Sequence, residues 1–273
     1  MGVVNDPDLK LLIVLFLVVI LAVTAWIFRD DIFAPVEEPV VALPQPAVEE
    51  TPPRKEPVHP IASPEMSMTA ESELVPLPPL DDSDAYFLLA LVDLFGSGVE
   101  PLLVNEALVD KFVTTVDNLS RSRVAEKIRP VGRLQGTFLV DAGDSARTYV
   151  LSPENYSRYS PLVNMASSAD LDALVVTYRR FYPLFQESYE RLGYPDAYFN
   201  DRVVEVIDHL LATPDPVGPI RLVRPHVLYE FADAELEALS SGQKLLLRMG
   251  PENSSVARQV LRDFRLRIAT PSG

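Results

Sequence analysis

Residues 34–80 contain twelve prolines and no glycine, and this stretch limits the possible fold more than any other feature. Each proline fixes φ and lacks a backbone N–H, so the stretch cannot form regular helix or sheet. We therefore predict that residues 29–80 form an acidic, proline-rich, disordered linker. Two Pro-x-x-Pro spacings occur in it, at Pro57–Pro60 and Pro76–Pro79. Such spacings arise by chance in proline-rich chain, so we interpret them as part of a spacer.

An apolar run of eighteen residues, Leu11–Phe28, precedes the linker and contains Thr24 as its one polar residue. A helix of this length spans ~27 Å, which is about the thickness of bilayer hydrocarbon. The sequence therefore predicts a short tail at residues 1–10 and a transmembrane helix at residues 11–28 that anchors the chain in the lipid bilayer. A cleaved signal peptide is the alternative, because Val23–Ala25 resembles a cleavage site. The run is longer than a typical signal core, which favours the anchor.

The orientation of this anchor depends on very few charges. Lys10 and the amino terminus on one side oppose Arg29 on the other, which is nearly a tie under the positive-inside rule. A short tail before a single early span usually stays in the cytoplasm. We therefore expect a single-pass protein of the cytoplasmic (inner) membrane, with the C-terminal domain periplasmic or external.

The remaining residues, 81–273, show the periodicity of a mostly helical globular domain. Helices are predicted at Ser83–Gly96, Leu108–Leu119, Ser167–Gly193, Asn200–Leu211, 233–240, 242–249 and 252–268. Ser83 and Asn200 are predicted N-caps, and Ser167 with Asp170 has the spacing of a capping box. The first helix is apolar nearly all round, which predicts a central position in the core.

One small β-hairpin interrupts the helical pattern. Thr137–Val140 and Thr148–Leu151 alternate as strands and flank a glycine-containing turn. Residues 220–229 are predicted to be extended or irregular, because Pro219 and Pro225 break helices. The expected fold class is therefore mainly α: a helical domain with one small β-hairpin, preceded by a transmembrane helix and a proline-rich linker.

Composition excludes several classes of function. Without cysteine the chain has no thiol nucleophile, no disulfide framework and no Cys-ligated metal site. A net charge of −15 argues against general nucleic-acid binding, because phosphates would be repelled. The chain has three histidines and lacks a P-loop, a dinucleotide fingerprint and a nucleophile elbow, so we predict neither a cofactor nor a metal.

Two acidic constellations invite a metal-site interpretation. Asp201, Glu205 and His209 lie four residues apart on one predicted helix face. The di-iron helix motif needs a three-residue Glu–His spacing, whereas four suits ordinary pairing on a helix surface, which we favour. Asp141 and Asp144 suggest a calcium loop, but the required distal glutamate is missing, which favours a hairpin turn.

Aromatic and carboxylate side chains offer two further sites. The aromatic run comprises Tyr178, Phe181, Tyr182, Phe185, Tyr189, Tyr194, Tyr198 and Phe199. Its helical spacing predicts core packing rather than a platform for sugar rings. A carboxylate pair for glycoside hydrolysis would come from Glu187, Glu190, Asp196 and Glu205, but the sequence sets no distance between them.

Basic side chains gather in three places in this acidic chain. The first cluster comprises Arg121, Arg123, Lys127, Arg129 and Arg133, the second Arg258, Arg262 and Arg265, and the third Arg221, Arg224 and His226. A solvated face that pairs with local carboxylates is one interpretation. The other is recognition of an anionic or protein partner, because arginine forks match carboxylate and phosphate geometry. The first two clusters, without Arg133, are our candidate partner-binding residues.

Five short motifs, each different from the others, lie along residues 80–270. They are Leu80–Asp84, Arg158–Leu162, Tyr194–Pro195, Arg221–Pro225 and Gly242–Gly250. Together with the apolar span and the acidic linker, they resemble the bacterial domain-of-unknown-function family 3014. The resemblance implies a bacterial envelope protein and supplies no activity, cofactor or catalytic residue.

These observations predict a membrane-anchored envelope protein with a binding or scaffolding domain rather than an enzyme. Its expected partners are the bilayer and a protein or anionic component of the envelope. Two alternatives remain open: a carboxylate-dependent enzyme that acts on envelope polymer, and an anchored cytoplasmic adaptor with the opposite orientation.

Overall fold

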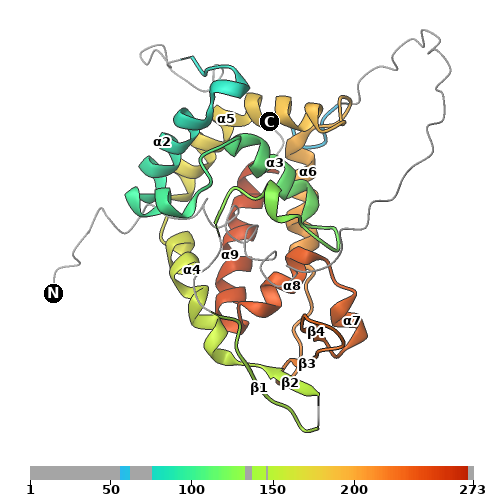
Figure 1. The fold of residues 1–273 in the computed structure, drawn as a ribbon. Helices are drawn as coiled ribbons and strands as arrows, with labels where there is room; N and C mark the ends of the chain where they lie inside the picture. The colour runs from blue at the N-terminus through green and yellow to red at the C-terminus, as the bar shows by residue number, and fades with distance from the viewer. Residues whose placement is uncertain (1–55, 62–75, 133–136, 146, 270–273) are drawn as a thin grey trace, which may run out of the picture.

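The computed structural model describes residues 56–61, 76–132, 137–145 and 147–269. Long helices pack around one another in these residues, and a small sheet lies at one end of the domain (Figure 1). The predicted transmembrane helix lies outside the described residues. Within them, no helix is both long and apolar enough to cross a membrane.

The domain is mainly helical, as predicted. Its α-helices are α2 (Asp84–Phe95), α3 (Leu108–Asn118), α4 (Ser160–Ser167), α5 (Leu171–Arg191), α6 (Phe199–Leu211), α7 (Ala234–Glu237), α8 (Ser241–Arg248) and α9 (Pro251–Ile268). Short 3-10 helices are η3 (Leu80–Asp82), η4 (Ser97–Leu102), η5 (Glu126–Ile128) and η6 (Pro153–Arg158). Helix α3 packs against α5 and α6, while α9 contacts α4, α5, α6 and α8. Helices α3 and α9 therefore hold the bundle together.

Aromatic rings fill the main core, as the spacing predicts. Phe185 is fully buried, and its ring centroid lies 5.0 Å from Phe112, 5.6 Å from Tyr178 and 5.9 Å from Phe199. The hydroxyl of Tyr178 donates to Asn200 Oδ1 at 3.0 Å, so this buried polar tip is satisfied. The core thus connects α3, α5 and α6 through their rings.

Helix α2 is not the central helix that its composition predicts. Phe87 and Leu91 are buried against the core, but Leu89 is 62% exposed. Helices α3 and α5 cover one face of α2, and its apolar residues on the other face remain at the surface. Apolar content alone cannot distinguish a central helix from a helix with one covered face.

Ser83, the predicted N-cap of α2, does not cap this helix. The hydroxyl of Ser83 donates to the carbonyl of Leu80 at 2.7 Å and makes no cap hydrogen bond to α2. Asp84, the first residue of α2, caps another helix: its carboxylate accepts from the N–H groups of Ala107 and Leu108 at 2.7 and 2.6 Å. The start of α2 thereby fixes the start of α3.

Two further predicted caps are corrected. Asp170 caps α5 by accepting from the N–H groups of Asp172 and Ala173, whereas Ser167 ends α4. Asn200 lies inside α6, which begins at Phe199, and its side chain makes long-range hydrogen bonds instead.

The sheet has four antiparallel strands in the order β1-β2-β3-β4. They are β1 (Val140–Ala142), β2 (Thr148–Leu151), β3 (Arg221–Val223) and β4 (Glu230–Phe231). Strands β1 and β2 form the predicted hairpin, but the first strand covers Val140–Ala142 instead of Thr137–Val140, because its pairing continues into the predicted turn. The turn requires Gly143, where a Cβ would lie 2.6 Å from the Thr148 hydroxyl. The prediction of a single hairpin is incomplete, because residues 221–231 add a second one. A small separate core of Leu151, Ile220, Leu222, Phe231 and Leu247 secures the sheet on α8.

A short part of the predicted linker lies on the domain. Residues 56–61 lie against the start of α6, where Ile61 packs on the main core (blue segment beside α6, Figure 1). Leu77 also packs on this core, and Leu80 is buried in it. These contacts with the core were not predicted from the sequence.

Candidate functional site

A pocket of about 440 Å³ lies between the small sheet and the first turns of α9. Its walls are mostly aliphatic, proline and aromatic side chains, namely Val150, Leu151, Pro153, Tyr156, Pro216, Pro219, Ile220, Leu246, Leu247 and Pro251. Polar lining comes from Asp141, Asp215, Ser254 and Arg258. This is the size and character of small-ligand sites, which are apolar hollows with a few placed polar groups.

The tight turn between α8 and α9 sets the position of this pocket. Gly250 occupies the turn with φ of 84°, and a Cβ there would lie 2.5 Å from the Tyr156 ring. Asn253 Nδ2 donates to the carbonyls of Tyr156 and Met249, both at 2.9 Å. Helix α9 is therefore held directly against η6, and its first turn lines the pocket.

Two polar atoms in the pocket wall have no hydrogen-bond partner among the described residues. Ser254 is 5% exposed, and its Oγ is buried and unpaired. One helical turn further on, Arg258 uses its terminal nitrogens on Asp215, at 2.8 and 3.2 Å, while its Nε is buried and unpaired. Buried polar atoms without a partner are costly and rare in native proteins. Both atoms are donors without an acceptor in the described part of the chain, and both residues line the pocket.

The charges around the pocket are nearly balanced. The N-terminus of α9, which no side chain caps, adds the positive end of an eighteen-residue helix. Asp215 neutralises Arg258, and the Asp141 carboxylate also lines the hollow. The site therefore favours an uncharged acceptor oxygen over a free carboxylate.

A second hollow of about 710 Å³ continues along the sheet. It shares Val150, Pro216, Pro219 and Ile220 with the first, so the two meet at the segment 216–220. Val217, in this segment, is fully exposed and lines the second hollow. The two hollows together suit an elongated ligand.

The first basic cluster does not form one cationic patch. Arg121 and Arg202 both bind the buried carboxylate of Asp117, at 2.8 and 3.0 Å. Arg121 also donates to the hydroxyl of Tyr194 at 3.0 Å, and the Tyr194 ring stacks on Tyr189. Burial, and then the charge of Asp117, raise the pKa of Tyr189 to about 12. This network joins the end of α3 to α6.

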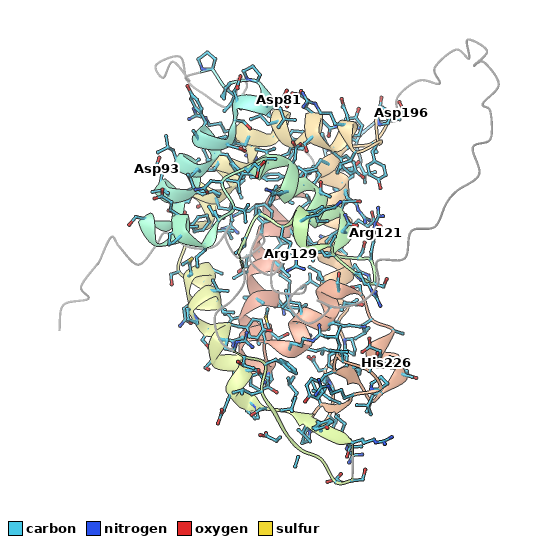
Figure 2. The ribbon with its side chains drawn as sticks, viewed as in Figure 1. Asp81, Asp93, Arg121, Arg129, Asp196 and His226 are labelled. Atoms are coloured by element: carbon cyan, nitrogen blue, oxygen red, sulfur yellow. The ribbon has the colours of Figure 1, made fainter. Side chains whose placement is uncertain are left out.

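The other described members of the first basic cluster do not lie on one surface. Arg129 is 5% exposed and donates to the carbonyl of Val124, whereas Arg123 and Lys127 are exposed. Arg133 lies outside the described residues. Figure 2 shows that Arg121, Arg129 and His226 lie well apart on the domain.

The basic stripe on α9 is largely paired. Arg265 makes a bidentate contact with Asp208 of α6, at 2.5 and 2.8 Å. Arg262 is exposed and contacts Gln259 on its own helix, and Arg258 is the pocket residue described above. Of the predicted candidates, the structure thus brings Arg258 into a hollow.

Asp201, Glu205 and His209, for which the sequence favours surface pairing over a metal site, face separate partners. Asp201 accepts backbone N–H groups of Val58 and His59, while Glu205 pairs with Arg202 at 2.9 Å. His209 lies 2.8 Å from the hydroxyl of Ser240. In the described ranges, no group of three His, Asp or Glu side chains is placed to hold a metal ion.

Sequence reasoning missed Ser254 and the pocket. One signal was available: Gly250-Pro251 marks a helix start, and Ser254 and Arg258 follow at helical spacing on one face. The opposite walls come from segments about 40 and 100 residues earlier in the chain. Their proximity could not be read from local patterns.

Residues 108–265 match the family described as "Protein of unknown function (DUF3014)", and this match covers more than half of the chain. The chain belongs to this family. The DUF3014 match contains every residue of the pocket but excludes η3 and α2. The curated proteins and the solved structures contain no match to this chain.

Proposed function

We propose that the protein is a binding protein whose domain takes an elongated, uncharged ligand in the pocket at the start of α9. The observation that supports this proposal is the apolar hollow in which Ser254 Oγ and Arg258 Nε lack partners. A ligand oxygen that reached either atom would supply the acceptor that it lacks. Apolar walls would contribute the remaining affinity.

The favoured ligand is an extended segment of a partner protein. A main-chain carbonyl is an uncharged acceptor, whereas the headgroup of a fatty acid would face the carboxylates of Asp141 and Asp215. The volumes of the two neighbouring hollows, about 710 and 440 Å³, leave room for several residues of such a segment. This deepens the binding or scaffolding role that the sequence predicts.

We also propose that the predicted membrane anchor and linker hold this domain at the membrane. Residues 11–28 would hold the protein in the cytoplasmic membrane, the predicted linker would join this anchor to the domain, and the domain would face the periplasm or exterior. The chain should then remain in membranes through a carbonate wash and keep residues 1–30 by mass. A C-terminal phosphatase fusion should be active and the matching fluorescent fusion dark; the reverse result would favour the cytoplasmic adaptor.

Site-specific photo-crosslinking in cells tests the pocket. A photoreactive residue at Val217 should yield an adduct to a peptide segment of one protein, identified by mass spectrometry. Ser254→Leu should reduce this adduct at least tenfold, because the added atoms enter the pocket. The same photoreactive residue at Val227, which is 56% exposed and lines neither hollow, is the matched control.

Thermal unfolding of the Ser254→Leu variant must show a folded domain for the comparison to count, and Ser254→Val provides a smaller change. An unaltered adduct in a folded variant would refute the pocket as the binding site.

An enzyme would instead release fragments from envelope polymer and lose that activity on Glu or Asp substitution. Glu187 and Glu190, named for such chemistry, hydrogen-bond to Arg191 and Gln186.

A further inference from the structure

A short segment of the proline-rich region binds the domain through its backbone. The N–H groups of Val58 and His59 donate to the two carboxylate oxygens of Asp201, at 2.9 and 2.7 Å. The carbonyl of His59 accepts from Asn200 Nδ2 at 2.8 Å. Two adjacent residues at the start of α6 thus bind both donors and the acceptor of one short segment, which bends at Val58 and His59.

The receiving side chains are held in place by the core. Asn200 is fully buried, and its amide also accepts from the Tyr178 hydroxyl and donates to the carbonyl of Ile268 at 3.1 Å. These contacts fix the amide before any peptide arrives. A preorganised site loses little conformational entropy when it binds.

The contact excludes proline at two adjacent positions. Two consecutive N–H groups must reach Asp201, so neither of the two middle positions can be proline. Pro57–Pro60 meets this condition, and it is the one Pro-x-x-Pro in residues 34–80 with two non-proline residues inside. In Pro76–Pro79 the second middle residue is Pro78, which has no N–H. The flanking prolines restrict the backbone on either side of this bend, which lowers the entropic cost of binding.

We propose that Asn200 and Asp201 form a recognition site for Pro-x-x-Pro peptides that bend at the two middle residues, and that residues 56–61 occupy it as a displaceable ligand from the same chain. Val58 is 72% exposed, and the contact depends on three hydrogen bonds and the packing of Ile61. Covalent linkage gives this weak ligand a high effective concentration. A second peptide with the same spacing competes for the site. Release lengthens the tether between the predicted anchor and the domain.

Fluorescence anisotropy on the full chain tests this proposal. The probe is a labelled peptide of residues 53–63. A variant that we call the emptied chain carries Val58→Pro together with His59→Pro, which removes both N–H donors and leaves Asn200 and Asp201 without the chain's own segment. The peptide should bind the emptied chain at least tenfold more tightly than wild type, because the wild-type segment competes. Adding Asp201→Asn should weaken binding at least tenfold, since two hydrogen bonds to a charged acceptor are impaired.

Asp208→Asn in the emptied chain is the matched control, because Asp208 lies on the same helix and pairs with Arg265. It should leave peptide affinity unchanged. No binding to the emptied chain, or equal binding with and without Asp201→Asn, would overturn the proposal.

Amide hydrogen exchange on the wild-type chain tests the proposal even if the proline variant does not fold. The Val58 and His59 amides should be protected, and Asp201→Asn should remove this protection without altering the amides of α5. Rapid exchange of both amides in wild type would equally overturn the proposal.

Discussion

His209 connects α6 to α8 through hydrogen bonds, and its ring responds to pH. Its Nε2 lies 2.8 Å from the hydroxyl of Ser240, which caps α8, and its carbonyl accepts from Gln243 at 3.1 Å. Burial, followed by the positive charge of Arg202, lowers the pKa of His209 below its ordinary 6.5. The folded domain therefore favours the neutral ring.

This lowered pKa predicts a loss of stability in mild acid. The unfolded chain binds the proton first as pH falls below 6.5, so the stabilisation is complete above that pH and is lost as pH falls through the folded pKa. Between pH 7 and 5, the free energy of unfolding in urea should fall more steeply for wild type than for His209→Gln. His226→Gln, at an exposed position, should keep the wild-type slope. Equal slopes for wild type and His209→Gln would contradict this assignment.

Residue patterns predicted the positions of basic side chains better than their roles. The spacing of Arg258, Arg262 and Arg265 on one helix is visible in the sequence. Their partners are not, because Asp215 and Asp208 belong to other elements and approach only in the fold. A cation cluster in a sequence therefore does not show how much positive charge remains at the surface.

At the scale of elements, the turn into α9 provides a graded test of backbone strain. Gly250 combines φ of 84° with contact to the Tyr156 ring, Gly193 has φ of 106° in open space, and Gly98 has neither constraint. Gly250→Ala should lower the free energy of unfolding the most, by about 2–4 kcal/mol. Gly193→Ala should cost about 1 kcal/mol and Gly98→Ala nearly nothing. Urea unfolding measures all three, and a cost at Gly250 no larger than at Gly193 would exclude the ring contact as a constraint.

Helix existence was predictable here, but helix starts and short strands were not. Apolar periodicity placed α3, α5 and α9 because each buries a regular stripe of side chains. The cap predictions failed where long-range partners were stronger: Asn200 bonds to Tyr178 and Ile268 instead of its own helix end. Strands β3 and β4 span three and two residues, which is too short for alternation to appear in the sequence.

At the scale of the whole molecule, the pocket depends on contacts between distant parts of the chain. Its walls combine β2, η6, the segment 215–220 and the α8–α9 turn. The sequence predicted most of these elements but not their assembly, because no local signal specifies which helix supports a sheet. The family match does not supply that information either, since its description assigns no function.

The limits of the folding unit give the last prediction. The family match begins at residue 108, yet α2 contributes to the core: the ring of Phe87 lies 5.1 Å from Phe181, 5.5 Å from Phe185 and 6.2 Å from Phe112. A chain of residues 76–273 should therefore unfold cooperatively with a helical circular dichroism spectrum. A chain of residues 96–273 should lose that cooperative transition, because it also lacks the Asp84 cap on α3.

Phe87→Ala in the longer chain separates the contribution of the ring from the loss of the whole helix. It should lower the free energy of unfolding by about 3–5 kcal/mol, because a large buried side chain leaves a cavity. Leu89→Ala on the same helix, at a 62% exposed position, should change it by less than about 1 kcal/mol. If residues 96–273 unfolded cooperatively at the temperature of the longer chain, α2 would be an appendage, and the matched region would approximate the folding unit.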